Sequence, residues 1–158
     1  MITQIRRRRT TRRGTTVVET AVVLPVFLTF LFAIFEFGHA QMVNNMLNSA
    51  CRAAARVGSV EGTTSADVIA RINQTMSPVI SPDNVTIFVN DASVYDSGGS
   101  TPTSPAELEE LPSIELSEAE PRQMFVVRAR LNYNDIALIP MSFLDGVVLN
   151  SQAFMRHE

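Results

Sequence analysis

The stretch AVVLPVFLTFLFAIF, residues 21–35, decides how this chain is organised. It carries no charge, and extending it from Val17 to Gly38 gives about twenty residues, enough to cross a hydrocarbon core of about 30 Å. Pro25 should bend such a helix without ending it, because proline is tolerated in membrane helices. The sequence therefore predicts a transmembrane helix over residues 15–38.

An arginine cluster precedes this stretch, and no comparable cluster follows it; its members are Arg6, Arg7, Arg8, Arg9, Arg12 and Arg13. The chain has a net charge of −3, and the part after Gly38 is net acidic. The positive-inside rule then makes residues 1–14 a basic cytoplasmic leader, with Arg12 and Arg13 at the membrane interface. Residues 39–158 are predicted to lie outside the bacterial cytoplasmic membrane. Nucleic-acid binding is not expected, because no aromatic residues are interspersed among these arginines.

A cleavable secretory signal is the alternative to a retained membrane helix. Gly38, His39 and Ala40 could form a cleavage site before Gln41. The length of the apolar stretch argues against this alternative, as do the carboxylates of Glu19 and Glu36, which bracket it.

Helical periodicity continues beyond the membrane stretch. One face of residues 39–57 is apolar and consists of Val43, Met46, Leu47, Ala50, Ala54 and Val57. A continuous helix from about Thr15 to Val57 is predicted, on the order of 60 Å long, half in lipid and half packed on the exported domain. Glu36 and His39 are three residues apart, so they can meet on one helical face at the membrane interface.

The segment RGTTVVETAVVLPVFLTFLFAIFEFGHA, residues 13–40, resembles the N-terminal signature of TadE-like proteins, the pseudopilins of tight-adherence (Flp) pilus systems. The resemblance rests on a set of eight residues, namely Arg13, Gly14, Glu19, Leu24, Pro25, Glu36, Phe37 and Gly38. Thr20 and His39 depart from the family, which usually has an aromatic residue and an arginine there. These departures leave the class intact and weaken the assignment to a particular branch.

The resemblance implies that a prepilin peptidase cuts after Gly14 and leaves Thr15 as the mature N-terminus. The protein would then be a substrate and not an enzyme, a minor pilin or pseudopilin in contact with membrane lipids, other pilin-class subunits and pilus assembly proteins. Glu19 is the candidate for subunit assembly, because a carboxylate in an apolar helix is costly without a partner. Alternatively, Glu19 lies at headgroup level and favours the positive helix N-terminus.

The pattern of residues 39–158 predicts an α+β fold for the exported part. A capping-box pattern begins at Thr64, and Val68, Ile69, Ile72 and Met76 form an apolar stripe before Pro78. Alternation predicts strands over 85–89 and 125–133, each with one buried face, and a third strand over 147–155. Together these elements predict a small antiparallel sheet of about three strands packed on the long helix.

Residues 91–121 differ in composition from the rest of the chain. They are rich first in Ser, Gly and Pro and then in Glu, with few apolar residues to anchor them. A mobile acidic loop is predicted here, and partner docking or cation binding is its alternative role.

Catalytic chemistry is not indicated by any motif. The two histidines, His39 and His157, fall in no ligand or triad pattern, so no catalytic residue, metal site or cofactor is predicted. Cys51 is expected to be a small buried residue on the helix, and an intermolecular bridge is the alternative. The leading hypothesis is a TadE-like pseudopilin; the alternative is a membrane-anchored or secreted binding domain.

Overall fold

The computed structural model describes residues 13–96, 98, 102, 104–139 and 142–158. Its elements are α1 (Arg13–Gly58), α2 (Ser65–Met76), β1 (Val85–Asp91), α3 (Ser93–Asp96), α4 (Pro105–Glu109), β2 (Met124–Asn132) and β3 (Val148–Arg156), with short 3-10 turns η1 (Pro82–Asn84), η2 (Leu116–Glu118), η3 (Tyr133–Asp135) and η4 (Ser142–Leu144). The predicted α+β class, with a long N-terminal helix and a three-stranded antiparallel sheet, is confirmed.

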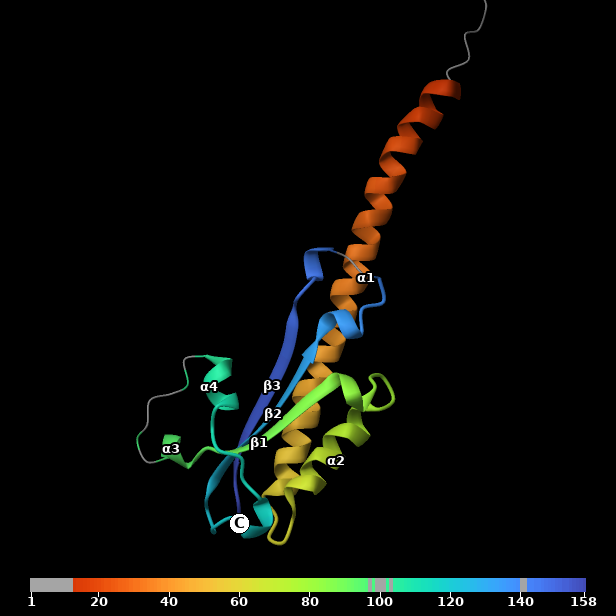
Figure 1. Ribbon diagram of the computed structural model, residues 1–158. Coiled ribbons are helices and arrows are strands. Elements are labelled where there is room, and N and C mark those ends of the chain that lie inside the picture. The colour runs from red at the N-terminus through yellow and green to blue at the C-terminus, as the bar shows by residue number, and fades with distance from the viewer. Residues whose placement is uncertain (1–12, 97, 99–101, 103, 140–141) are drawn as a thin grey trace, which may run out of the picture.

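Helix α1 dominates the shape of the molecule. Its 46 residues run unbroken through Pro25 and past Gly38, and its length is on the order of 70 Å. The continuous helix predicted over Thr15 to Val57 is therefore confirmed to within two residues at each end. Figure 1 shows the N-terminal half of α1 projecting beyond the domain, while its C-terminal half lies along the sheet.

Helix α2 begins with the predicted capping box. Thr64 Oγ1 accepts a hydrogen bond from the Asp67 backbone N–H, and Asp67 Oδ2 accepts one from the Thr64 N–H. These bonds satisfy two backbone donors that the first turn of a helix leaves unpaired. Val68, Ile72 and Met76 of the predicted apolar stripe are buried, whereas Ile69 departs from it and is 37% exposed. Helix α2 lies beside α1 (Figure 1).

The sheet has the order β1-β2-β3, with both pairs antiparallel. Val89 of β1 lies opposite Val127 of β2, which in turn lies opposite Ala153 of β3. One face of the sheet packs on α1 and α2. The core between them contains Val43, Leu47, Ala50, Cys51, Ala54, Val68, Ile72, Met76, Val85, Val89, Phe125, Val127, Ala129 and Leu131.

The outer face of β2 is also covered, so the expectation of one buried face per strand is wrong for this strand. Val126 is fully buried and Arg128 is 2% exposed. Helix α4 lies on the side of the sheet away from α1 (Figure 1). Glu109 of α4 accepts hydrogen bonds from Arg128 Nε at 3.0 Å and from Arg130 Nη1 at 2.9 Å.

The described parts of residues 91–121 have more anchors than the sequence indicated. Leu108 and Leu116 are fully buried, and Asn90 Nδ2 donates to the Leu108 carbonyl at 2.8 Å. Glu115 Oε1 accepts from the Ser65 N–H at 2.8 Å, and this hydrogen bond lowers the pKa of the Glu115 carboxyl. Residues 97, 99–101 and 103 lie outside the described residues, and the mobility of the segment stays a prediction.

Gly58 ends α1 at a close approach between elements. A Cβ at this position would lie 2.8 Å from Leu116 Cδ1 and 2.9 Å from Val68 Cγ2, closer than real Cβ contacts come. The C-terminus packs at the same place, because the Glu158 N–H donates to the Ser59 carbonyl at 2.8 Å. Glycine therefore lets the end of α1 contact α2 and the segment before β2.

Candidate functional site

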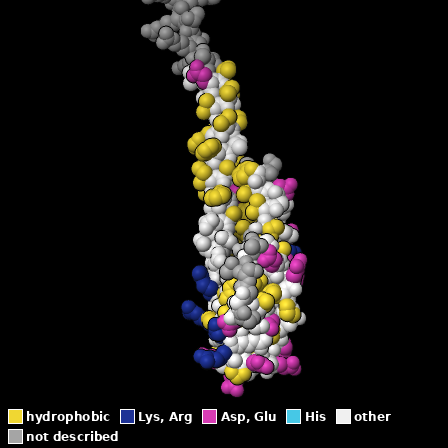
Figure 2. Space-filling view, turned by 90° about the vertical axis from the view of Figure 1, so that its left-hand side faces the viewer, with side chains coloured by type: hydrophobic (Ala, Val, Ile, Leu, Met, Phe, Trp, Pro, Cys, Tyr) yellow, Lys and Arg dark blue, Asp and Glu magenta, His cyan; other side chains and the backbone are white. Residues whose placement is uncertain are grey.

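The N-terminal half of α1 carries an exposed apolar surface. Its most exposed members include Val17, Val22, Val26, Phe30 and Phe35, each more than 60% exposed. Of the described helices, α1 alone is long and apolar enough to cross a membrane, and none of its most apolar stretch is buried within the protein. Figure 2 shows this half covered by hydrophobic side chains, with most charges on the domain. A surface of this kind is stable in lipid and not in water.

The residues of the expected processing site lie at the start of α1. Helix α1 begins at Arg13, so Gly14 and Thr15 belong to its first turn. Arg12, expected at the membrane interface with Arg13, lies outside the described residues.

Glu19 is exposed on the apolar half of α1. Thr20, Val23, Leu24 and Phe27 line a shallow depression beside it. Within the described chain, which excludes the side chains of residues 13–15, no hydrogen bond or salt bridge reaches the Glu19 carboxylate. The carboxylate therefore faces whatever surrounds the helix.

Glu36 is fully buried, although it lies on the helix where the membrane stretch ends. Its Oε1 accepts hydrogen bonds from the Tyr133 hydroxyl at 2.7 Å and from the Leu138 N–H at 3.1 Å. Its Oε2 accepts one from the Ile139 N–H at 3.1 Å. A buried carboxylate is tolerated only with such partners, so Glu36 fastens the connection between β2 and β3 to α1.

His39 reaches Glu36 only through Tyr133. His39 Nδ1 lies 3.2 Å from the Tyr133 hydroxyl oxygen, and the two rings are tilted with centroids 6.1 Å apart. Because the hydroxyl proton is directed to Glu36, the oxygen can accept a hydrogen bond from a protonated Nδ1. Burial, reinforced by the Glu36 carboxylate, raises the pKa of Tyr133 above its ordinary value. Glu36 and His39, which were expected to meet directly, are therefore joined through Tyr133. Glu36, His39, Tyr133 and the backbone N–H groups of Leu138 and Ile139 are called the Glu36 junction below.

Sequence reasoning missed Tyr133 and the two backbone donors as partners of Glu36. The sequence offered one signal. Tyr133 takes an inward-facing position at the end of the alternation predicted over 125–133, and a buried tyrosine hydroxyl needs a partner. The backbone N–H groups of Leu138 and Ile139 carried no signal, since every residue except proline has one.

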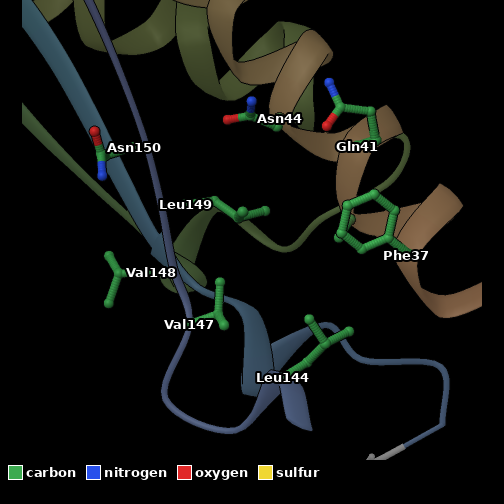
Figure 3. Close-up of a pocket in the computed structure, with 9 residues that line it drawn as sticks. Phe37, Gln41, Asn44, Leu144, Val147, Val148, Leu149 and Asn150 are labelled. Atoms are coloured by element: carbon green, nitrogen blue, oxygen red, sulfur yellow. The ribbon is translucent and has the colours of Figure 1, made fainter. Parts of the chain in front are cut away.

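A groove lies next to the junction, between α1 and the start of β3. It has a volume of about 300 Å³ and is lined by Phe37, Ala40, Gln41, Asn44, Leu144, Val147, Val148, Leu149 and Asn150. Figure 3 shows Leu149 pointing toward α1, with Phe37 and Leu144 at one end of the groove. The lining carries no ionisable side chain, so this groove offers no acid or base for chemistry.

The described residues contain no group of three or more His, Cys, Asp or Glu side chains that could hold a metal ion. Cys51 is buried in the core, with its Sγ 3.8 Å from the Ser151 carbonyl. Its expected role as a small buried helix residue is confirmed, and burial raises the pKa of its thiol.

Comparison with known proteins gives one family match. The family model described as TadE-like protein matches residues 14–56, which is nearly the whole of α1. The match extends beyond residues 13–40 into the half of the helix that packs on the sheet. Neither the curated proteins nor the solved structures give a match. Proteins of the TadE-like family are generally non-enzymatic, and this match, with the apolar helix, supports a membrane-anchored component associated with Tad pili. The resemblance of this chain to the TadE-like family is therefore confirmed over residues 14–56.

Proposed function

We propose that this chain is a non-enzymatic minor pilin or pseudopilin that a prepilin peptidase processes after Gly14. The mature protein then contributes to the assembly of a tight-adherence (Flp-type) pilus or a related secretion apparatus. The observation that carries the proposal is the family match, which begins at Gly14 and ends near the last residue of α1. One half of that helix is free for lipid or other subunits, and the other half belongs to the domain core.

Processing is tested by the mass of the purified protein from cells that contain the peptidase. Loss of residues 1–14 supports the pilin function, whereas an intact N-terminus contradicts processing after Gly14. The Gly14→Leu variant should stay at full length, because the bulky side chain stands next to the cut bond. Gly38→Leu is the matched control: a Cβ on this glycine of the same helix meets nothing within 4 Å. Normal processing of Gly14→Leu would refute the site.

Signal-peptide cleavage after Ala40 would produce a different mass and a secreted domain. Such a cut would remove Glu36, which accepts hydrogen bonds from Tyr133, Leu138 and Ile139. It would leave three donors at the base of the domain without their acceptor. The Glu36 junction therefore favours a chain that keeps α1 over a secreted binding domain.

Glu19 is the residue that we assign to subunit assembly. Cleavage after Gly14 would create an α-amine on Thr15, about 6 Å along the helix axis from Glu19. The amine is poorly placed at the positive end of its own helix dipole. A carboxylate from an adjacent subunit would stabilise it in surroundings where water screens charge weakly.

The Glu19→Gln variant tests this assignment, because it removes the charge and keeps the shape. It should insert and be processed normally but crosslink less to other pilin-class subunits in the membrane. Thr20→Val is the matched control, since it removes a neighbouring hydroxyl whose one hydrogen bond among the described residues lies within the helix, to the Thr16 carbonyl at 2.8 Å. Equal crosslinking of Glu19→Gln and wild type would remove Glu19 from the assembly contact and would favour its headgroup position.

The proposed topology has residues 1–14 in the cytoplasm, residues 15–38 in the bacterial cytoplasmic membrane and residues 39–158 outside. Its support is the arginine asymmetry of the leader. A single cysteine at position 60, in a Cys51→Ala background, should react with a membrane-impermeant maleimide added to intact spheroplasts. Val60 is 52% exposed, so the reagent can reach this position. Reaction only after lysis would contradict the topology.

A further inference from the structure

The connection between β2 and β3 presents large apolar side chains to the surroundings. Leu138 is 67% exposed and Phe143 is 53% exposed, which makes them the two most exposed large apolar side chains among the described residues after α1. The sequence from Ile136 to Leu144 contains no charged residue, and Asp135 and Asp145 flank it. Exposed apolar surface bordered by polar residues marks an interaction site.

The Glu36 junction sets the level of this connection along α1. The N–H groups of Leu138 and Ile139 both bind the Glu36 carboxylate at 3.1 Å. About twenty helix residues separate Thr16 from Glu36, and at about 1.5 Å each they span about 30 Å, which is the thickness of a hydrocarbon core. If the membrane begins near Thr16, Leu138 lies at its outer boundary.

The exposed side chains of the connection continue the apolar surface of α1. Ile34, Phe35 and Phe37, which flank Glu36 on the helix, are each more than 60% exposed. Figure 1 shows the connection around η3 and η4 as the end of the domain nearest the projecting half of α1. In Figure 2, hydrophobic side chains gather at this end of the domain, beside the helix.

We propose that Leu138 and Phe143 insert into the outer boundary of the same bilayer that α1 crosses. Lipid is the occupant that these observations favour, because the uncharged connection continues a surface that is itself suited to lipid. Apolar side chains at this depth are transferred out of water, while the flanking aspartates stay in the headgroup region. The domain then contacts the membrane at a second place, which restrains its tilt. This inference rests on the membrane anchoring of α1 in the proposed function.

Depth-dependent quenching of an environment-sensitive fluorophore tests the proposal. The full chain, with Cys51→Ala as background, receives the single substitution Leu138→Cys or Phe143→Cys, is labelled with a nitrobenzoxadiazole probe and is placed in phosphatidylcholine nanodiscs. Val26→Cys in the middle of the apolar half of α1 is the positive control. Val60→Cys is the matched negative control, because Val60 is exposed to nearly the same degree as Phe143 but lies beyond the far end of α1.

The proposal expects blue-shifted emission at positions 138 and 143, with stronger quenching by nitroxides near the headgroup than by nitroxides deep in the acyl chains. Position 60 should show neither effect. Quenching at position 26 without quenching at 138 and 143 would overturn the inference and leave the membrane anchor intact. Blue-shifted emission that lipid nitroxides do not quench and that grows with the protein-to-lipid ratio would overturn it in favour of a second copy. Loss of quenching at position 26 would overturn the anchor and the inference together.

Discussion

The Glu36 junction should contribute measurably to the stability of the domain. The Tyr133→Phe variant removes the hydroxyl that donates to Glu36 Oε1 at 2.7 Å and keeps the ring that fills the core. The carboxylate, fully buried, keeps only the two backbone donors. A hydrogen bond to a charged group contributes about 1.5–3 kcal/mol. With a urea m-value of about 2 kcal/mol/M, the unfolding midpoint should fall by about 1 M.

The buried thiol of Cys51 provides the assay. It is the only cysteine of the chain, and it lies in the core between α1 and the sheet. Its burial, together with a raised pKa, protects it from thiol reagents in the folded state. The labelled fraction at each urea concentration, measured by mass on the chain held in nanodiscs, therefore reports unfolding of the domain.

Tyr95→Phe is the matched control, because Tyr95 is the only other tyrosine and its ring makes an edge contact with Phe154. This variant should keep the wild-type midpoint within a few tenths of a molar urea, since Tyr95 is only half-buried and its hydroxyl makes no hydrogen bond within the described residues. Equal midpoints for Tyr133→Phe and Tyr95→Phe would refute the reasoning. A double-mutant cycle with Glu36→Gln then measures the coupling, which should be about 0.5–3 kcal/mol for groups in direct contact.

Three further experiments test the burial of Tyr133, of Gly58 and of Arg128. The folded-state pKa of Tyr133 is raised above the ordinary value of about 10, so the contribution of Tyr133 to stability is fully present below about pH 10 and falls as the pH rises further. Urea titrations followed by far-UV dichroism should therefore show that the free energy of unfolding falls more steeply with pH for wild type than for Tyr133→Phe. Gly58→Ala should lower the free energy of unfolding by about 1–3 kcal/mol because the added Cβ has no room. Gly38→Ala in the same helix should be neutral or stabilising by up to about 1 kcal/mol, and reversed effects in urea titration would contradict the packing at the end of α1. Glu109→Gln should lower the free energy of unfolding by about 2–3 kcal/mol because it leaves the buried Arg128 without its counter-charge. Asp96→Asn, in an exposed ion pair, should lower it by less than about 1 kcal/mol, and equal urea midpoints for the two variants would rule out the stabilising role of the buried pair.

Local patterns in the sequence determined the long helix, the capped helix α2 and the three strands. The apolar run of residues 21–35, the capping box at Thr64 and the alternation of β2 each involve residues within a few positions of one another. The geometry of a helix or strand places residues with such spacing on one face or at a helix cap, so these features can be predicted without knowledge of distant contacts. The same locality made the leader, the candidate cleavage site and Glu19 recognisable as a resemblance to TadE-like proteins.

Contacts between distant residues decided the rest. Glu36 and Tyr133 are 97 positions apart, and only the return of the chain along β2 brings the hydroxyl to the carboxylate. Likewise Arg128, which alternation assigns to solvent, is buried because α4 covers the outer face of the sheet and supplies Glu109. A polar residue on a strand has the same local pattern whether water or another segment lies above it. Its burial depends on partners that satisfy its hydrogen bonds, and those partners are set by tertiary packing.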